Sequence, residues 1–199
     1  ISGTTPDIIQ LRYQLDDTNP YWLTIGNPML RPQTTHLITT QNNISLNSHG
    51  GMVMVNATAE WYRNSIVSKE TYYTADTYLP DIDYKARQGS TISSFENVND
   101  GNRQNLFANI IMPLSALRSS ASMALTASRS SLPFYYNDQL DKSITTVFGG
   151  NIVLGTSLIP RTRVNLTTAF NTSHTSNQKS DVTNRINTLN VIAWAETDI

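Results

Sequence analysis

Five tyrosines are the side chains in this sequence best suited to binding a ligand. They fall in two polar stretches that we expect to be long loops. Exposed aromatic rings stack on sugars and other flat ligands, and they carry much of the binding energy at interfaces. Two interpretations stay open: the rings contact a ligand, or they pack the loops together and join an aromatic belt at a membrane surface. The five are Tyr72, Tyr73, Tyr78, Tyr135 and Tyr136.

Residue patterns that support catalysis or metal binding are weak. The three histidines are far apart and match no ligand spacing. The aspartates between Asp76 and Asp83 resemble a loose calcium loop, but the glycine and closing glutamate of an EF-hand are missing. There is no GxSxG motif. With no cysteine, disulfides, thiolate metal sites and a cysteine nucleophile are excluded. We therefore expect no enzymatic activity, metal or cofactor.

The composition favours a β protein. Of 199 residues, only 15% are charged, below the quarter or so of an average soluble protein, and the net charge is -1. Uncharged polar residues replace the missing charge, with 20 Ser, 25 Thr and 20 Asn. Thr favours strands, whereas Ser and Asn favour turns over helix interiors. No basic excess suggests a nucleic-acid partner. No apolar run approaches the roughly 20 residues of a membrane-spanning helix, and ISGTTPDIIQ does not resemble a signal peptide.

The stretch 52–64, MVMVNATAEWYRN, has the clearest periodicity. Every second residue from Val53 to Trp61 is apolar, and the residues between them are mostly polar. This pattern predicts a strand with one apolar and one polar face. A soluble sandwich would turn the apolar face inward, whereas a membrane barrel would turn it to lipid and the polar face to its lumen. In the second case, Glu60 and Tyr62 would face the lumen and contact a passing substrate.

The remaining elements predict an antiparallel up-and-down meander of about seven or eight strands. We expect a loop with one short strand, Ile8 to Gln14, in 1–32, and the strand meander in 33–199. The segment 121–127 also fits a helical stripe, but its serines favour a strand. The expected strands are 33–46, 52–64, 90–112 (broken near 99–101), 121–127, 146–157, 162–171 and 186–196.

The predicted links between these strands alternate in length. Short links at 47–51, 113–118 and 159–161 alternate with long ones at 65–89, 131–143 and 173–185. Outer-membrane barrels have short periplasmic turns and long external loops in this alternation. That orientation would place Trp61, Phe148 and Phe170 at similar heights, as in an aromatic girdle. The meander is therefore predicted to be part of a larger transmembrane β-barrel.

The segment GNPMLRP at 26–32 resembles a motif of TonB-dependent outer-membrane receptors, in particular the Bacteroidetes-type outer-membrane β-barrel family. It follows PDIIQLRYQLDDTNPYWL and precedes a strand, and FENV at 95–98 with Gly101 is similar to a later segment of that family. The motif positions are expected to shape a turn rather than to bind a ligand (Gly26, Asn27, Pro28, Leu30 and Pro32).

The resemblance implies a receptor that imports nutrients across the bacterial outer membrane. Such a receptor has a barrel of about 22 strands, closed by a plug domain that the partner TonB displaces. This sequence has neither the plug nor a TonB-contacting segment, and it lacks a final strand that ends in an aromatic residue. We therefore interpret 1–199 as a segment from the C-terminal half of the barrel.

The implied partners are membrane lipid, the plug of the same parent chain, TonB through that parent, a nutrient ligand and, as in some related receptors, a lipoprotein. Two other hypotheses are retained. One is a soluble β-sandwich that binds a carbohydrate or protein partner. The other is a small closed barrel of eight strands that serves as a structural anchor.

Overall fold

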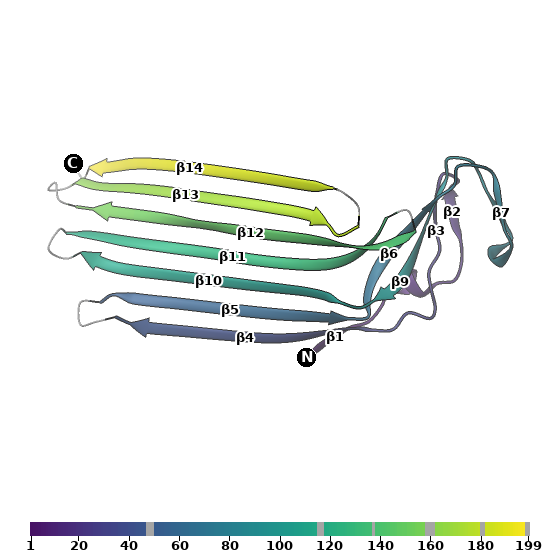
Figure 1. Ribbon diagram of the computed structural model, residues 1–199, viewed down its shortest axis with the longest axis horizontal. Helices are drawn as coiled ribbons and strands as arrows, with labels where there is room; N and C mark the ends of the chain where they lie inside the picture. The colour runs from purple at the N-terminus through teal and green to yellow at the C-terminus, as the bar shows by residue number, and fades with distance from the viewer. Residues whose placement is uncertain (47–49, 115–117, 137, 158–161, 180–181, 198–199) are drawn as a thin grey trace.

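The chain is built almost entirely of β-strands, with 75% of residues in strands and 4% in helices. The computed structural model describes residues 1–46, 50–114, 118–136, 138–157, 162–179 and 182–197, and for residue 136 only the backbone. Long strands lie side by side in one sheet, and a smaller sheet lies at one end of them (Figure 1). We call that end of the long strands the upper end.

The large sheet is an antiparallel meander of eight strands, as the sequence predicts. The spatial order follows the chain, and the strands of a second sheet come from the segments between β1 and β4 and between β5 and β10. In this order, the strands are β1 (Ser2–Thr4), β4 (Gln33–Ser45), β5 (Met52–Arg63), β10 (Gly101–Leu114), β11 (Ser119–Tyr136), β12 (Gln139–Thr156), β13 (Thr162–Asn177) and β14 (Thr183–Thr197).

The small sheet combines residues from the N-terminal segment and from the insertion. Its order is β2 (Asp16–Asn19), β3 (Trp22–Thr24), β9 (Thr91–Val98) and β6 (Ser65–Tyr72), with β3 and β9 parallel. A separate hairpin consists of β7 (Thr77–Leu79) and β8 (Tyr84–Ala86), joined by the 3-10 helix η1 (Pro80–Ile82). The cluster of buried apolar side chains lies here, around Leu23, Ala86 and Ile92.

The large sheet has two distinct faces because its ladders run without a register shift from β5 to β14. The apolar face carries Val53, Leu106, Met123, Ile152 and Leu166. Within the described residues, no second layer covers this face, and Leu106, Ile152 and Leu166 remain 47%, 45% and 39% exposed (Figure 1). The opposite face, the polar face, carries mostly small and polar side chains.

The sheet is open rather than closed. β14 has a ladder partner on one side only, and β4 pairs with β1 only from Gln33 to Thr35 on its outer side. The described strands therefore do not form the small closed eight-stranded barrel considered above.

The expected strand at Ile8 to Gln14 is wrong. Residues Ile8–Leu11 form the helix α1, which Asp7 caps through a hydrogen bond from the Ile9 amide of 3.2 Å. The Gln10 side chain accepts a hydrogen bond from the Asp7 amide at 2.9 Å and completes a capping box. These local hydrogen bonds satisfy backbone amides that the start of a helix leaves without partners. The stabilisation that they give the helix decides the local structure, although the pattern of apolar residues suggested a strand.

Two of the expected long loops are largely strand. β11 continues to Tyr136 and β12 begins at Gln139, so the predicted loop 131–143 is a tight hairpin. β13 reaches Asn177 and β14 begins at Thr183, which shortens the predicted loop 173–185. In the third predicted long loop, 65–89, residues Ser65–Tyr72 form β6. The predicted short links include residues 47–49, 115–117 and 159–161, which lie outside the described residues.

Candidate functional site

The apolar face of the large sheet carries a continuous zone of apolar side chains, which we call the apolar belt. It follows from the registers, because directly paired residues across the ladders share a face. Its residues are Ile38, Ile44, Val53, Val55, Ala57, Ala59, Trp61, Leu106, Ala108, Ile110, Met112, Leu114, Ala121, Met123, Leu125, Ala127, Phe148, Gly150, Ile152, Leu154, Val164, Leu166, Phe170, Leu189, Val191, Ala193 and Ala195, with Thr40, Asn42 and Thr168 as polar positions within it.

The described part of the belt is somewhat shorter than the apolar band of an outer-membrane barrel. On β10, it extends from Leu106 to Leu114, nine residues. At ~3.3 Å per residue, this is about 26 Å along the strand, or about 20 Å of height for a strand tilted by ~40°. The apolar band of an outer-membrane barrel is about 25 Å tall and uses 9–11 residues per strand.

The upper boundary of the belt runs obliquely across the sheet. We follow the apolar face of each strand toward the upper end. The last apolar residue before a polar one on that face is Trp61 on β5, Leu106 on β10 and Leu189 on β14. We call the residues that are paired directly from strand to strand a ladder row. The ladder row that starts at Trp61 crosses five strand pairs and reaches Thr183 on β14, which is six residues from Leu189. With ~3.3 Å per residue and ~4.8 Å between strands, the boundary makes an average angle of about 40° with the ladder rows from β5 to β14, although it is level from Leu106 on β10 to Phe148 on β12. An apolar zone that is level in space therefore requires strands tilted by about 40°.

Aromatic side chains lie at the upper boundary. On three strands, the last apolar residue of the apolar face before a polar one, toward the upper end, is aromatic: Trp61, Phe148 and Phe170. The rings of Phe148 and Phe170 are 5.6 Å apart and inclined at 49°. Phe170 lies beside Gly150, where an added Cβ would come within 3.2 Å of its ring and 2.6 Å of the Ala124 carbonyl oxygen. The glycine leaves room for the ring on the sheet surface.

A row of polar side chains lies above the belt, two residues from it on β10, β11 and β12 and four residues from it on β13 and β14. Arg129 is paired directly with Gln104 on one side and Thr146 on the other, and the row continues through His174 and Arg185. We call these five residues the donor row, since all can donate hydrogen bonds. Among the described long strands, the carboxylates of Glu60, Asp141 and Glu196 all lie on the polar face.

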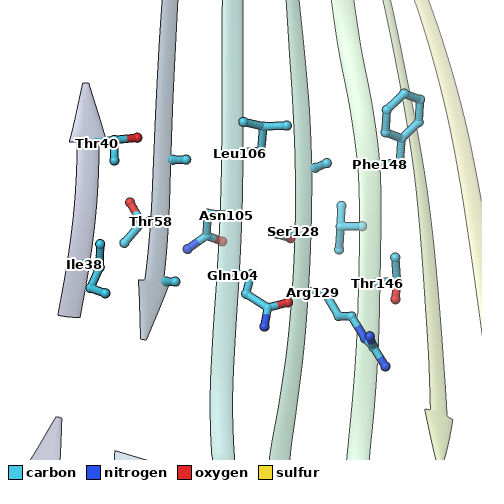
Figure 2. A pocket seen from close by; sticks show the side chains of 14 residues that line it. Ile38, Thr40, Thr58, Gln104, Asn105, Leu106, Ser128, Arg129, Thr146 and Phe148 are labelled. Carbon is cyan, nitrogen blue, oxygen red and sulfur yellow. The ribbon is translucent and has the colours of Figure 1, made fainter. Parts of the chain in front are cut away.

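A groove hollows the apolar face where the belt meets the donor row. Its volume is about 500 Å³, and its sides are formed by Ile38, Leu106 and Phe148. Ala57, Ala59 and Ala127 lie between these larger residues and leave the space open. Figure 2 shows Gln104 and Arg129 together at one end of the groove and Leu106 and Phe148 toward the other. The groove therefore combines an apolar bed with an exposed guanidinium group.

A cluster of polar side chains, which we call the junction cluster, connects the small sheet to the large one. Glu96 of β9 accepts a hydrogen bond from the Tyr135 hydroxyl of β11 at 2.5 Å and pairs with Lys69 of β6 at 3.3 Å. Lys69 also lies 5.4 Å from the centre of the Tyr135 ring and 4.0 Å from Asp138. Asp138 accepts a hydrogen bond from Thr71 at 2.6 Å. The Tyr135 hydrogen bond and Lys69 hold the pKa of Glu96 below its ordinary value.

The five candidate tyrosines have different surroundings. Tyr72 and Tyr78 are 61% and 60% exposed, and Tyr78 donates a hydrogen bond to Asp83 at 2.5 Å. Tyr73 packs against the buried cluster of the small sheet, and Tyr135 belongs to the junction cluster. The side chain of Tyr136 lies outside the described residues. Tyr72 and Tyr78 therefore keep exposed rings, whereas Tyr73 and Tyr135 have structural contacts.

Glu60 and Tyr62 lie on the polar face of β5, as the alternation predicts. The Tyr62 hydroxyl donates a hydrogen bond to Glu60. Arg103 of β10 is the direct ladder partner of Glu60. On this face, an arginine is thus placed opposite a carboxylate.

The motif at 26–32 forms a turn beside the end of α1 and the small sheet. Gly26 contacts α1, because an added Cβ would lie 2.5 Å from the Arg12 carbonyl oxygen. The turn that follows contains Pro28, and it is closed by a hydrogen bond from the Leu30 amide to the Asn27 carbonyl oxygen at 3.3 Å. The Asn27 side chain donates to the Phe95 carbonyl oxygen at 2.9 Å, and Leu30 is buried. The exposed Pro32 comes directly before β4.

Comparison of the chain with protein-family models, with curated proteins and with solved structures finds no match. Within the described residues, no group of His, Asp and Glu side chains is arranged to hold a metal ion. In the same residues, no helix is long and apolar enough to cross a membrane.

No sequence motif pointed to Arg129, Gln104 or Lys69, and Glu96 was noted only as part of FENV, not for its contacts. For Arg129, a signal was present, since it is the position on β11 where apolar alternation ends. For Lys69 and Glu96, no local signal exists, because their contact depends on the pairing of β6 with β9.

Proposed function

We propose that this chain is part of the wall of a bacterial outer-membrane β-barrel, in a receptor of the TonB-dependent class that takes up a nutrient. The observation that carries the proposal is the uncovered apolar belt with its oblique upper boundary. Its nine residues on β10 and its average angle of about 40° are comparable to those of strands that cross an outer membrane. The chain itself would perform no chemistry.

The open edges support a barrel larger than the described strands. An edge strand presents unpaired N–H and C=O groups, which are costly in a hydrocarbon environment. β14 offers such an edge over 15 residues. In the proposed barrel, further strands pair with β14 and with the outer side of β4.

The receptor class is supported by GNPMLRP and by the position of the small sheet at the upper end (Figure 1). In the proposed mechanism, the small sheet and its hairpin contribute to ligand capture outside the cell, where Tyr72 and Tyr78 expose their rings. The ligand then passes along the polar face, which carries Glu60 and Tyr62, once TonB has displaced the plug of the parent chain. A lipoprotein partner would assist capture.

Single cysteines test which face meets the lipid, because the chain has none of its own. In the full-length protein in outer membranes, we expect Ile152→Cys and Leu166→Cys to resist a water-soluble maleimide, since lipid covers them. Asn151→Cys, on the polar face beside Ile152, serves as the matched control and is expected to react at least ~10-fold faster, because the lumen holds water.

A soluble sandwich predicts another result. Ile152→Cys would again be protected, but in a protein that purifies from the soluble fraction without detergent. That outcome would exclude the membrane proposal, as would equal labelling of positions 151 and 152 in membranes.

A further inference from the structure

We propose that the groove beside Arg129 binds one membrane lipid with an anionic, phosphorylated headgroup. The phosphate is bound by Arg129 and Gln104, and an acyl chain lies over Ala127, between Leu106 and Phe148. This inference depends on the proposed membrane position of the apolar face, and it adds a specific ligand to that face.

The shape of the groove fits an elongated apolar group. Ala127 of β11 lies between Leu106 of β10 and Phe148 of β12, and Ala57 and Ala59 of β5 lie on the other side of β10. The volume of about 500 Å³ lies within the range of small-molecule sites. A groove in a surface that faces hydrocarbon is filled by an acyl chain, because an empty one would forfeit dispersion contacts.

The charge distribution indicates that the headgroup is an anion. On the polar face, Arg103 and Arg163 are the direct ladder partners of Glu60 and Glu196. On the apolar face, Arg129 is paired with Gln104 and Thr146, neither of which can neutralise it. The described long strands place no carboxylate on this face. The guanidinium therefore has five donors for an external acceptor, and a phosphate matches their geometry.

The position of the donor row matches the depth of a lipid phosphate. On β10, β11 and β12, it is two residues above the last apolar row, which holds Leu106, Ala127 and Phe148. An amphiphile in the groove thus meets apolar side chains along its tail and the arginine at its headgroup. A peptide or a second copy of this chain would place polar backbone in the belt, where nothing could satisfy its hydrogen bonds.

Native mass spectrometry of the full-length protein in detergent tests the site, with phosphatidylglycerol and phosphatidylcholine as probes. We expect the unmodified protein to retain one phosphatidylglycerol in preference to phosphatidylcholine. Arg129→Gln should lower its retention about tenfold, because charge-assisted hydrogen bonds to the phosphate are lost. Arg129→Lys should retain more than Arg129→Gln, since the charge is kept.

The matched control is Arg103→Gln, which removes the same charge from the polar face and is expected to leave retention unchanged. Ala127→Phe fills the groove without adding polarity and should reduce retention of phosphatidylglycerol. Inorganic phosphate at the same concentration should not displace the lipid, because it lacks the acyl chain.

Equal retention by the unmodified protein, Arg129→Gln and Arg103→Gln would overturn the site, as would displacement by inorganic phosphate alone. Failure of the proposed function looks different: none of the proteins would then be recovered from the membrane fraction. A site that fails while every variant is membrane-inserted leaves the barrel proposal standing.

Discussion

At the scale of single residues, two asparagines connect the N-terminal segment to the small sheet. Asn97 accepts a hydrogen bond from the Arg31 amide at 2.7 Å and donates to the carbonyl oxygens of Arg31 at 3.0 Å and Asn64 at 2.8 Å. Asn27 adds its hydrogen bond to Phe95. Half-buried amide groups paired in this way favour one arrangement of the chain, because each lost partner leaves a partly desolvated polar group unsatisfied.

Gly26 is the position where a single methyl group should do the most damage. In Gly26→Ala, the new Cβ would lie 2.5 Å from one backbone oxygen and 2.7 Å from both a backbone nitrogen and a second backbone oxygen. Backbone atoms cannot move aside as a flexible side chain can, so we expect a loss of about 1–3 kcal/mol in the local stability of 1–32.

Limited proteolysis of the folded protein measures this loss as faster cleavage within 1–32. Gly3→Ala is the control, because its Cβ would meet only the Gln33 carbonyl oxygen at 3.8 Å. Equal cleavage rates for the two variants would show that α1 and the motif do not pack as described.

At the scale of elements, the junction cluster determines how the small sheet meets β11. Glu96 and Lys69 come from adjacent strands, whereas Tyr135 comes from the extended upper part of β11. The extended part of β11 was predicted as loop, so the contact depends on residues whose strand character the alternation did not reveal.

Acid should weaken this contact. The folded-state pKa of Glu96 is below its ordinary value of 4.5, so folding favours the ionised carboxylate. The resulting stabilisation is present at neutral pH and is lost as the pH falls through the lowered pKa. Because the side chain is 40% exposed, we expect only about 0.5 kcal/mol.

Hydrogen-exchange protection factors of β6 and β9 amides, compared between neutral and acidic buffer, measure the effect. Glu96→Gln should lower protection at neutral pH and remove most of the pH dependence. Glu70→Gln on β6 removes a carboxylate outside the cluster and should change neither. A pH dependence that survives in Glu96→Gln would assign the effect to another group.

The sequence predicted the strands of the belt because a face that meets an apolar environment needs alternating apolar residues. Val53 to Trp61 and Val164 to Phe170 satisfy that requirement. The upper part of β11, Arg129 to Tyr136, has no such face, and its ladder is built from backbone hydrogen bonds that leave no period in the sequence. For the same reason, the insertion 65–98 was predicted only in part: its parallel contact of β3 with β9 joins segments almost 70 residues apart.

At the scale of the whole molecule, the open sheet requires neighbours. Apolar side chains lie on both faces of β14, with Leu189 and Val191 on one and Ile192 and Trp194 on the other. A strand of this kind at a free edge is a site for aggregation or for pairing with another strand. In the proposed barrel, a further strand pairs with β14. A free edge of β14 and a paired edge therefore differ in an observable way.

Amide hydrogen exchange distinguishes a free edge of β14 from a paired one. The upper part of the strand, Thr183 to Asn187, is suited to the measurement because it lies above the belt, where water has access. In an edge strand, alternate amides point away from the sheet and exchange fast, whereas a strand paired on both sides protects every amide. We expect all of these amides to be protected by at least ~100-fold in the full-length protein, since local opening of a ladder costs several kcal/mol.

The residues of β13 opposite them, Thr172 to Ser176, are the internal control, because their ladders with β12 and β14 are complete. Fast exchange at every second residue of β14, with β13 protected, would show that the edge is free and that the described strands are not part of a closed wall.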